Sequence, residues 1–349
     1  MKNILNVVFV IIGTLIGAGF ASGQEINLFF FSNGEKGIYG IIISSLLMGI
    51  IIFNTLKILD KYDIKNYKEL LEILIGKCKE GYIKTIINLI VNIFILISFF
   101  IMIAGFGAYF EQEFGIKGII GSTILAILSY ITFMNNVKGL IKVNQILVPT
   151  LIFFLVIIGI INIKDINILE INQHLIKSNN FGWLLDAILY SGYNSILLIP
   201  VIITLKNNIK SKKDIVLITS ITTIIIILLS LVIFLTLIKV DVNISNLEMP
   251  AVYVVSKISN IFRIMYGFII LASIFTTSVS LGTSFLKNTV SSEKMYKKVA
   301  IIICAFSVFI SNIGFSNLIN LLYPLFGYLG IIQMIQECRL LKNIKTKTY

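Results

Sequence analysis

Hydrophobic residues form long runs along this chain, and the short segments between the runs hold most of the charges. The runs are near the ~20 residues that an α-helix needs to cross a bilayer, and they lack the alternation of barrel strands. The pattern therefore predicts an all-α polytopic membrane protein. Ten spans are expected, at 4–31, 37–57, 85–110, 117–134, 143–163, 183–205, 215–238, 260–286, 298–311 and 316–336.

Composition supports a membrane protein. The 349 residues are 57% hydrophobic and only 13% charged, and their mean hydropathy is +0.96. A soluble domain with these values would expose a very large apolar surface, so we expect the lipid bilayer to surround the chain. Heavy use of Ile beside Asn and Lys is typical of an AT-rich bacterial genome. We therefore predict a multi-pass protein of the bacterial cell membrane.

The basic charges follow the predicted topology. The formal net charge is +12, and 22 of the 29 Lys and Arg residues lie in alternate loops and the two termini, whereas six lie in the other loops. Cytoplasmic loops of membrane proteins carry such an excess of Lys and Arg. We therefore predict cytoplasmic N- and C-termini, and we interpret the charge as a consequence of topology, not as a surface for nucleic acid.

Few residues could support enzymatic chemistry. The single histidine, His174, lies in a predicted external loop, and Cys78, Cys304 and Cys338 have no metal-type spacing. The predicted spans contain neither a Ser/His/Asp set nor a phosphate-binding loop. The sequence therefore predicts a protein that is not an enzyme and has no cofactor other than a coupling ion.

The first predicted span is interrupted by GTLIGAGFASGQ, residues 13–24. Glycines spaced four apart, such as Gly13 and Gly17, also serve close helix packing, and a signal peptide cleaved after Ala21 would have similar composition. Apolar residues resume at once through Phe29–Phe31, which argues against cleavage. We therefore expect a membrane helix that is discontinuous near its middle.

The sixth predicted span has a similar interruption. Residues 191–195, Ser-Gly-Tyr-Asn-Ser, lie near its middle, and Pro200 removes a backbone donor further on. The first span of each five-span half is therefore predicted to be discontinuous, which is the inverted-repeat plan of many secondary transporters. The domain boundaries expected from this plan are a first repeat at 1–163, an external connection at 164–182, a second repeat at 183–336 and a cytoplasmic tail at 337–349.

Broken helices suggest the kind of solute. The N-terminus of a half-helix offers free N–H groups to a carboxylate, whereas a C-terminus offers carbonyl oxygens to a cation or an ammonium group. The eighth span adds five hydroxyls within residues 273–280, although single Ser and Thr side chains often bond only to their own helix. These features predict a small zwitterion as substrate, together with a cation.

The ten-span plan, the GTLIGAG run at 13–19 and the hydroxyl cluster resemble the leucine-transporter fold of the amino acid-polyamine-organocation superfamily. The longer run GTLIGAGFASGQE resembles the bacterial YkvI family, which is classed among amino-acid permeases. The resemblance implies a substrate site at Gly17, Ala18, Gly19, Tyr190, Ser191, Tyr193 and Asn194, and a sodium site at Gly13, Ile16, Ser273, Thr276 and Thr277. Phe20 stands where sodium-coupled relatives of the fold often carry Asn, so both Na⁺ and H⁺ remain candidates for coupling.

Four further residues are candidates for gating or proton coupling. Glu25 lies six residues beyond Gly19, roughly 9 Å outward on a helix, and an acid in lipid needs a partner or a cavity. We expect it either to pair with Arg263 as an outer gate or to exchange a proton during transport. Asp186 and Arg263 could instead mark interfacial ends of spans, and Tyr109 could either cap the pocket or belong to an aromatic belt.

The function predicted from the sequence is secondary active transport of an amino acid or a similar small zwitterion, driven by H⁺ or Na⁺. The alternative is an amino-acid-sensing receptor subunit on the same fold, which would bind its ligand without net transport. A structural or enzymatic membrane subunit is a third interpretation. The loop at 239–259, with Pro250 followed by a short apolar stretch, is expected to cover the outer vestibule. Substrate identity and oligomeric state are left open.

Overall fold

The computed structural model describes residues 2–62, 64, 67–75, 81–134, 140–164, 181–209, 211–290 and 292–346. These residues form helices and no strands, and each predicted span has a helical counterpart. His174, Cys78 and most of the predicted 164–182 connection lie outside the described residues. The elements are α1 (Lys2–Leu15), α2 (Ala18–Ala21), α3 (Gln24–Phe29), η1 (Phe31–Asn33), α4 (Lys36–Lys61), α5 (Tyr67–Ile75), α6 (Gly81–Phe114), α7 (Gly118–Met134), α8 (Leu140–Lys164), α10 (Gly182–Thr204), η2 (Lys206–Asn208), α11 (Lys212–Leu237), η3 (Ile244–Asn246), α12 (Pro250–Ile258), α13 (Asn260–Thr289), α14 (Glu293–Ser311) and α15 (Phe315–Thr346).

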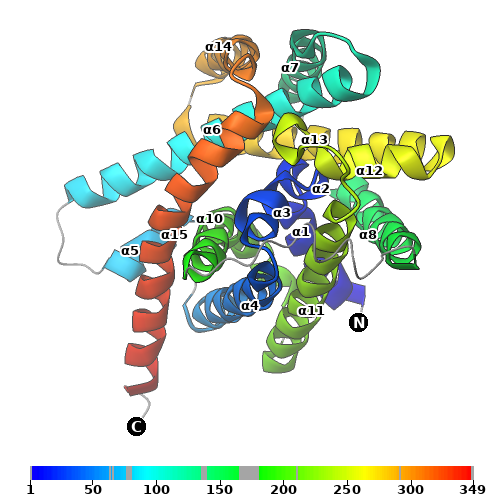
Figure 1. The fold of residues 1–349 in the computed structure, drawn as a ribbon. Coiled ribbons are helices and arrows are strands. Elements are labelled where there is room, and N and C mark those ends of the chain that lie inside the picture. The colour runs from blue at the N-terminus through cyan, green and yellow to red at the C-terminus, as the bar shows by residue number, and fades with distance from the viewer. Residues whose placement is uncertain are drawn as a thin grey trace.

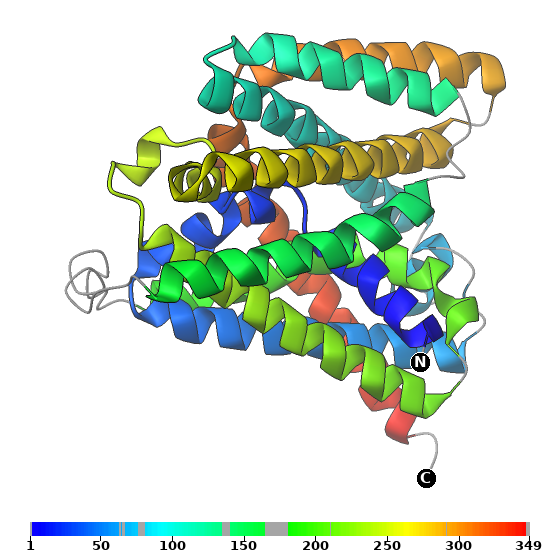
Figure 2. The same cartoon turned by 90° about the vertical axis from the view of Figure 1, so that its right-hand side faces the viewer.

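Two groups of helices surround the interrupted first span. In one group α10 packs against α4 and α15, and α4 packs against α11. In the other, α6 packs against α13 and α7, and α7 lies beside α14 at one edge of the molecule (Figure 2). The short α2 contacts α6 and α13, whereas α3 contacts α10, α11 and α15. The interrupted span therefore lies between the two groups, near the centre of Figure 1.

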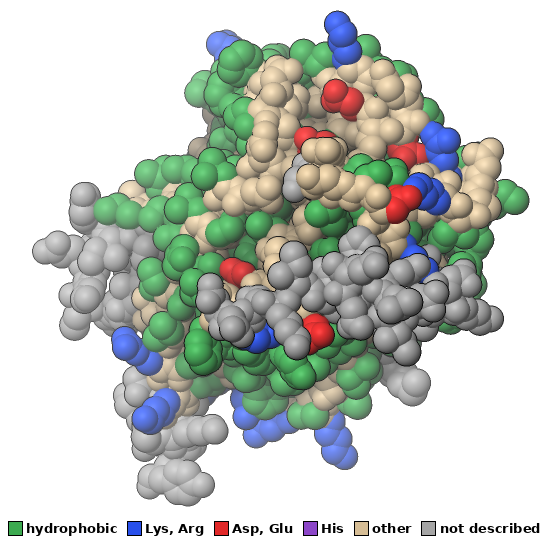
Figure 3. All heavy atoms as spheres, viewed as in Figure 1, with side chains coloured by type: hydrophobic (Ala, Val, Ile, Leu, Met, Phe, Trp, Pro, Cys, Tyr) green, Lys and Arg blue, Asp and Glu red, His purple; other side chains and the backbone are tan. Residues whose placement is uncertain are grey.

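The outer surface of the bundle is apolar, as a lipid environment requires. Six helices among the described residues are long and apolar enough to cross a membrane, namely α4, α6, α10, α11, α13 and α15. Large side chains such as Ile224, Phe268 and Leu321 are more than half exposed. Hydrophobic side chains are spread across the face in Figure 3, and the charged ones occur singly or in small groups. The predicted class of polytopic membrane protein is therefore confirmed.

The predicted break in the first span is confirmed, and it consists of two interruptions. At the first, Gly17 has extended backbone angles (φ −90°, ψ −170°) between α1 and α2. At the second, Gly23 has φ +83° between α2 and α3, in the left-handed region that costs a residue with a Cβ atom ~1–2 kcal/mol. Because glycine is free of that cost, the chain turns twice within seven residues.

The predicted break in the sixth span is wrong, because α10 is one continuous helix from Gly182 to Thr204. The polar side chains bond to carbonyl oxygens of the same helix: Ser191 Oγ donates to Ala187 O at 2.7 Å, and Asn194 Nδ2 donates to Tyr190 O at 3.0 Å. These bonds satisfy the polar groups without opening the backbone.

Glycine at position 192 serves helix packing. A Cβ atom there would collide with the carbonyl oxygen of Gly327 on α15, and one on Gly330 would collide with the carbonyl oxygen of Gly192. The three glycines therefore allow the backbones of α10 and α15 to touch, which is the use of small residues that is common between membrane helices.

The 239–259 segment lies against the second interruption of the first span, as expected for a cover. The backbone N–H of Ala251, in the first turn of α12, donates to the carbonyl oxygen of Ser22 at 2.8 Å. Just before it, the Gln112 side chain of α6 bonds to both backbone groups of Met249, at 2.8 and 2.9 Å. α12 thus satisfies a carbonyl that the break leaves free, and α6 holds the segment in place.

Candidate functional site

A buried carboxylate lies inside the broken first span. The turn at Gly23 directs Glu25 back toward α2, and only 3% of this residue is exposed. Its carboxylate accepts hydrogen bonds from the hydroxyl of Tyr193 on α10 and from the backbone N–H of Phe20. A Cβ atom on Gly19 would overlap the Glu25 carboxylate, so glycine at that position provides the room that the side chain occupies.

Aromatic rings enclose this carboxylate. The Tyr193 ring stacks on Tyr323 of α15 at 4.6 Å between centroids and on Phe29 at 5.7 Å. Tyr190 packs edge-on against Phe29 at 5.4 Å and against Tyr193 at 5.4 Å. We call Glu25, Phe29, Tyr190, Tyr193 and Tyr323 the Glu25 cluster. Within the part of the chain that the structure describes, no Lys or Arg forms an ion pair with Glu25.

The predicted substrate residues only partly converge. Gly19, Tyr190 and Tyr193 lie at the Glu25 cluster. Gly17 and Ala18 belong to the same break but face α6: a Cβ on Gly17 would lie 3.7 Å from Met102. Ser191 is turned toward α4, where its hydroxyl lies 3.3 Å from the carbonyl oxygen of Ser44. The amide of Asn194 bonds within α10. Ser191 and Asn194 therefore support the helix in this structure.

Four of the five predicted sodium ligands lie together. Gly13, Ile16, Ser273 and Thr276 line a small cavity of about 10 Å³, which Leu147, Val148 and Leu151 of α8 close. Ser273 Oγ donates to the Ile16 carbonyl at 2.9 Å and thereby ties α13 to the first interruption, whereas Thr276 Oγ1 donates to Ser273 O at 3.1 Å. The cavity has about the volume that one water molecule needs. Thr277 does not line it.

The predicted pairing of Glu25 with Arg263 is wrong. Arg263 Nε lies 2.7 Å from a carboxylate oxygen of Glu113, and its Nη2 donates to the Glu113 carbonyl at 2.6 Å. α6 extends beyond the predicted span and brings Glu113 to the first turn of α13, whereas the turn at Gly23 points Glu25 inward. Arg263 therefore joins α6 to α13, and it pairs with Glu113 instead of Glu25.

Tyr109 and Asp186 also lie outside the Glu25 cluster. Tyr109 is 4% exposed, lies one turn before Glu113, and packs so closely on Gly267 of α13 that a Cβ there would collide with its hydroxyl. Burial argues against a lipid-facing belt. Asp186 accepts a hydrogen bond from Asn33 Nδ2 at 2.7 Å. This bond joins the end of the first span to the start of α10.

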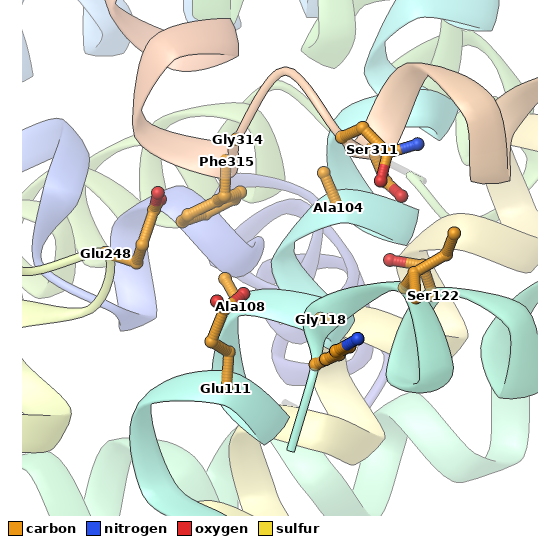
Figure 4. Close-up of a pocket in the computed structure, with 13 residues that line it drawn as sticks. Ala104, Ala108, Glu111, Gly118, Ser122, Glu248, Ser311, Gly314 and Phe315 are labelled. Carbon is orange, nitrogen blue, oxygen red and sulfur yellow. The ribbon is translucent and has the colours of Figure 1, made fainter. Parts of the chain in front are cut away.

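A separate polar cavity of about 300 Å³ opens between α6, α7 and the start of α15. Figure 4 shows Glu111, Glu248, Ser122 and Phe315 around it. The Phe315 ring, which is 1% exposed, also lies beside Ala18: a Cβ on Gly105 would be 2.9 Å from Phe315 and 3.1 Å from Ala18. Phe315 thus forms a wall between this cavity and the broken span.

The cavity residues were not predicted from the sequence, because they come from the ends of several expected spans and from the segments between them, and only the packing of these helices brings them together. Glu248 was the one available signal, since it is an acid two residues before Pro250 in the expected cover. Its carboxylate accepts hydrogen bonds from the backbone N–H and the hydroxyl of Ser316, at 2.6 and 2.8 Å, at the start of α15.

Comparison with known proteins identifies the family of this chain. No protein-family model matches it. It is 30% identical over 338 residues to the membrane protein YkvI of Bacillus subtilis (strain 168), and the alignment covers 93% of this chain and 92% of YkvI. The chain belongs to the YkvI family. It is also 24% identical over 338 residues to the YyaD protein of the same organism, with 97% and 96% of the two chains covered.

Solved structures of similar shape are membrane transporters. A manganese transporter of Eremococcus coleocola has a TM-score of 0.61 at 13% identity, with 95% of this chain and 77% of that chain covered. A Na⁺-coupled sialic acid symporter has a TM-score of 0.56 at 13% identity (97% and 77%). The nucleobase-cation-symport-1 family transporter Mhp1 has 0.55 at 12% identity (96% and 73%). This YkvI-family chain therefore has the leucine-transporter fold that the sequence predicted.

Proposed function

We propose that this protein is a secondary active transporter of an amino acid or a similar small zwitterion, coupled to H⁺ through Glu25. The observation that carries the proposal is the position of the Glu25 carboxylate inside the broken first span, in contact with Gly19 and the Phe20 N–H. The fold supports transport, because relatives of this architecture bind substrate at such breaks near the midplane.

The geometry suggests how proton and substrate would exchange. The Glu25 carboxylate occupies the place beside Gly19 where the sequence predicted the substrate carboxylate. Two carboxylates cannot share one set of donors without strong repulsion, so the substrate needs Glu25 either protonated or displaced. A neutral acid accepts hydrogen bonds more weakly than a carboxylate, and the backbone N–H groups would then be free for the substrate. In the protonated case, which we propose, each substrate bound would bring one proton with it.

The sodium alternative rests on the cavity at Gly13, Ile16, Ser273 and Thr276. Its oxygens come from both the first span and α13, so an ion there would tie the interrupted span to the helix group that contains α13. The hydroxyls of Ser273 and Thr276 donate to carbonyl oxygens in this structure and keep oxygen lone pairs with which to ligate an ion. Glu25 offers a full charge, whereas this cavity offers only dipoles. We therefore prefer H⁺ as the coupling ion.

The first experiment is a thermal-shift screen of the purified protein against amino acids and polyamines, with and without Na⁺. A ligand that binds only the folded state raises the unfolding temperature in proportion to the logarithm of its concentration, once it is in excess. We expect stabilisation by at least one amino acid, and loss of that stabilisation in Gly19→Leu but not in Gly182→Leu, where an added Cβ atom would meet no neighbour within 4 Å.

The second experiment is uptake of that amino acid into proteoliposomes. A proton gradient directed inward, with the outside more acidic than the inside, should drive accumulation without Na⁺. Accumulation that needs a Na⁺ gradient and ignores pH would refute proton coupling. Binding without accumulation under either gradient would favour the amino-acid sensor instead.

A further inference from the structure

A second buried acid lies near the far end of α15, away from the Glu25 cluster. Glu337 has no exposed surface, and Thr55 of α4 is its hydrogen-bond donor, with Oγ1 3.3 Å from both carboxylate oxygens. Tyr323 of the Glu25 cluster is on the same helix, fourteen residues earlier, which is about 21 Å along its axis. α15 therefore connects two buried carboxylic acids at different depths in the bundle.

Neutral polar groups surround Glu337. One helical turn before it, Gln333 is 7% exposed and accepts a hydrogen bond from the Tyr67 hydroxyl of α5 at 3.1 Å. The Gln333 amide nitrogen is buried and has no hydrogen-bond partner in the part of the chain that the structure describes. A buried donor without a partner is costly, and it indicates a position built for a polar ligand or a water molecule.

Among the side chains that the structure describes, no Lys or Arg forms an ion pair with Glu337. Tyr67 and Cys338 interact with it electrostatically, and neither is a cation. Burial, and next the negative charge of Glu337, raise the pKa of Tyr67. On α4, the Lys57 ammonium lies over the Phe53 ring at 4.5 Å from its centre, and beyond α10 the Lys206 ammonium donates to the Tyr62 carbonyl at 3.4 Å.

An ionised carboxylate that is stripped of water and lacks a cation costs several kcal/mol or more, so such a group binds a counter-ion or takes up a proton. A metal ion does not fit the geometry. The described residues contain no group of three His, Cys, Asp or Glu side chains that could hold one, and Thr55 already lies at hydrogen-bond distance in front of both oxygens. The remaining ligand is a proton.

We propose that Glu337, with Thr55, Gln333 and Tyr67, is a second proton-binding site, and that a proton taken up at the Glu25 cluster leaves the protein through it. The existence of the site stands on the geometry around Glu337 alone, whereas its part in proton release rests on the proposed function. The lysine pattern predicts that this end of α15 lies on the cytoplasmic side. Gly192, Gly327 and Gly330 hold α10 directly against α15 between the two acids.

The test of the site is infrared difference spectroscopy of purified protein during a pH titration. A protonated carboxylic acid has a C=O stretching band that a carboxylate lacks. We expect such a band in the wild type and its loss in Glu337→Gln, but not in Glu293→Gln, which removes an exposed acid at the start of α14. Absence of any band that Glu337→Gln removes would overturn the proposal.

A second variant tests the site in case Glu337→Gln does not fold. Thr55→Val keeps the shape of the side chain and removes the hydroxyl that bonds to Glu337. We expect the band to move to higher wavenumber, because the C=O bond stiffens when a hydrogen-bond donor is lost. A band that Thr55→Val leaves unchanged would assign it to another acid. Na⁺-dependent thermal stabilisation that disappears in Glu337→Gln would show that the ligand is a metal cation, and would also overturn the proposal.

The role in release is tested by transport. Glu337→Gln should keep exchange of internal for external substrate, which needs no net proton movement, and lose accumulation driven by a pH gradient. Unchanged accumulation would refute the release role, whereas a wild-type protein that shows the infrared band but neither exchange nor accumulation would refute the proposed function and leave the proton site standing.

Discussion

The first span and α10 carry similar residues and have different backbones. Both contain glycine and hydroxyl side chains in the middle of an apolar run, yet the first is interrupted at Gly17 and Gly23, whereas α10 is continuous. The difference lies in what each glycine does. Gly23 has a positive φ, and Gly192 has helical angles and touches another backbone. Glycine within a membrane helix therefore marks either a turn or a close contact.

The largest effect is expected at the contact. Gly192→Val would push a side chain into the Gly327 carbonyl, and backbone atoms cannot move aside without parting α10 from α15. We expect destabilisation at or above the ~3 kcal/mol upper end of ordinary overpacking, seen as loss of monodisperse protein in detergent. Gly182→Val is the matched control on the same helix, since its Cβ meets nothing within 4 Å. Equal yields for the two variants would refute the close contact.

The next effect concerns the acid that the break encloses. Glu25→Gln keeps the shape of the side chain and cannot bind and release a proton. We expect uptake driven by a pH gradient to fall at least tenfold and the remaining exchange to lose its pH dependence. Asp186→Asn, which alters an acid bound to Asn33 outside the cluster, should keep both. Uptake by Glu25→Gln that rises and falls with pH as the wild type does would exclude Glu25 as the proton carrier.

A moderate effect is expected at the second interruption. Gly23→Ala should lower the unfolding free energy by the ~1–2 kcal/mol of a left-handed residue, with an added term because the new Cβ would lie 3.1 Å from both Ala251 and Leu237. Gly115→Ala has a similar φ of +66° and no neighbour within 4 Å, so it measures the backbone term alone. Equal unfolding temperatures for the two variants would mean that neither Ala251 of α12 nor Leu237 of α11 crowds the new Cβ atom.

The smallest effect is expected at the ion pair between Asp241 and Lys257, within the segment 239–259 that lies against the second interruption. Hydrogen bonds from the Lys257 ammonium, at 2.6 Å, lower the pKa of the Asp241 carboxyl. A lowered pKa stabilises the closed segment at neutral pH, and this contribution is lost as the pH falls through the pKa of the folded state. Because the pair is exposed, the change is small. Limited proteolysis of 239–249 should increase slightly at acid pH in the wild type, whereas Asp241→Asn should show the acid level of cleavage already at neutral pH.

The sequence predicted the membrane class, the ten helical segments and the broken first span, since hydrophobic run length and glycine content are local properties. Of the five residues that the resemblance to the leucine-transporter fold implied as a sodium site, four line the small cavity at Ser273. The sequence prediction erred on α10, where local hydrogen bonds from Ser191 and Asn194 keep the helix intact. It also missed Glu113 as the partner of Arg263, because that contact depends on how far α6 extends.

By itself, then, the sequence determined which segments form apolar helices and where one of them must open, because hydrophobicity and the freedom of glycine act residue by residue. Only the tertiary structure decided which residues meet. The turn at Gly23 directs Glu25 to Tyr193 and not to Arg263, and α15 brings Glu337 to Thr55 from 282 positions away in the chain. Such pairs form where packed helices cross, and no local pattern of residues specifies the crossing.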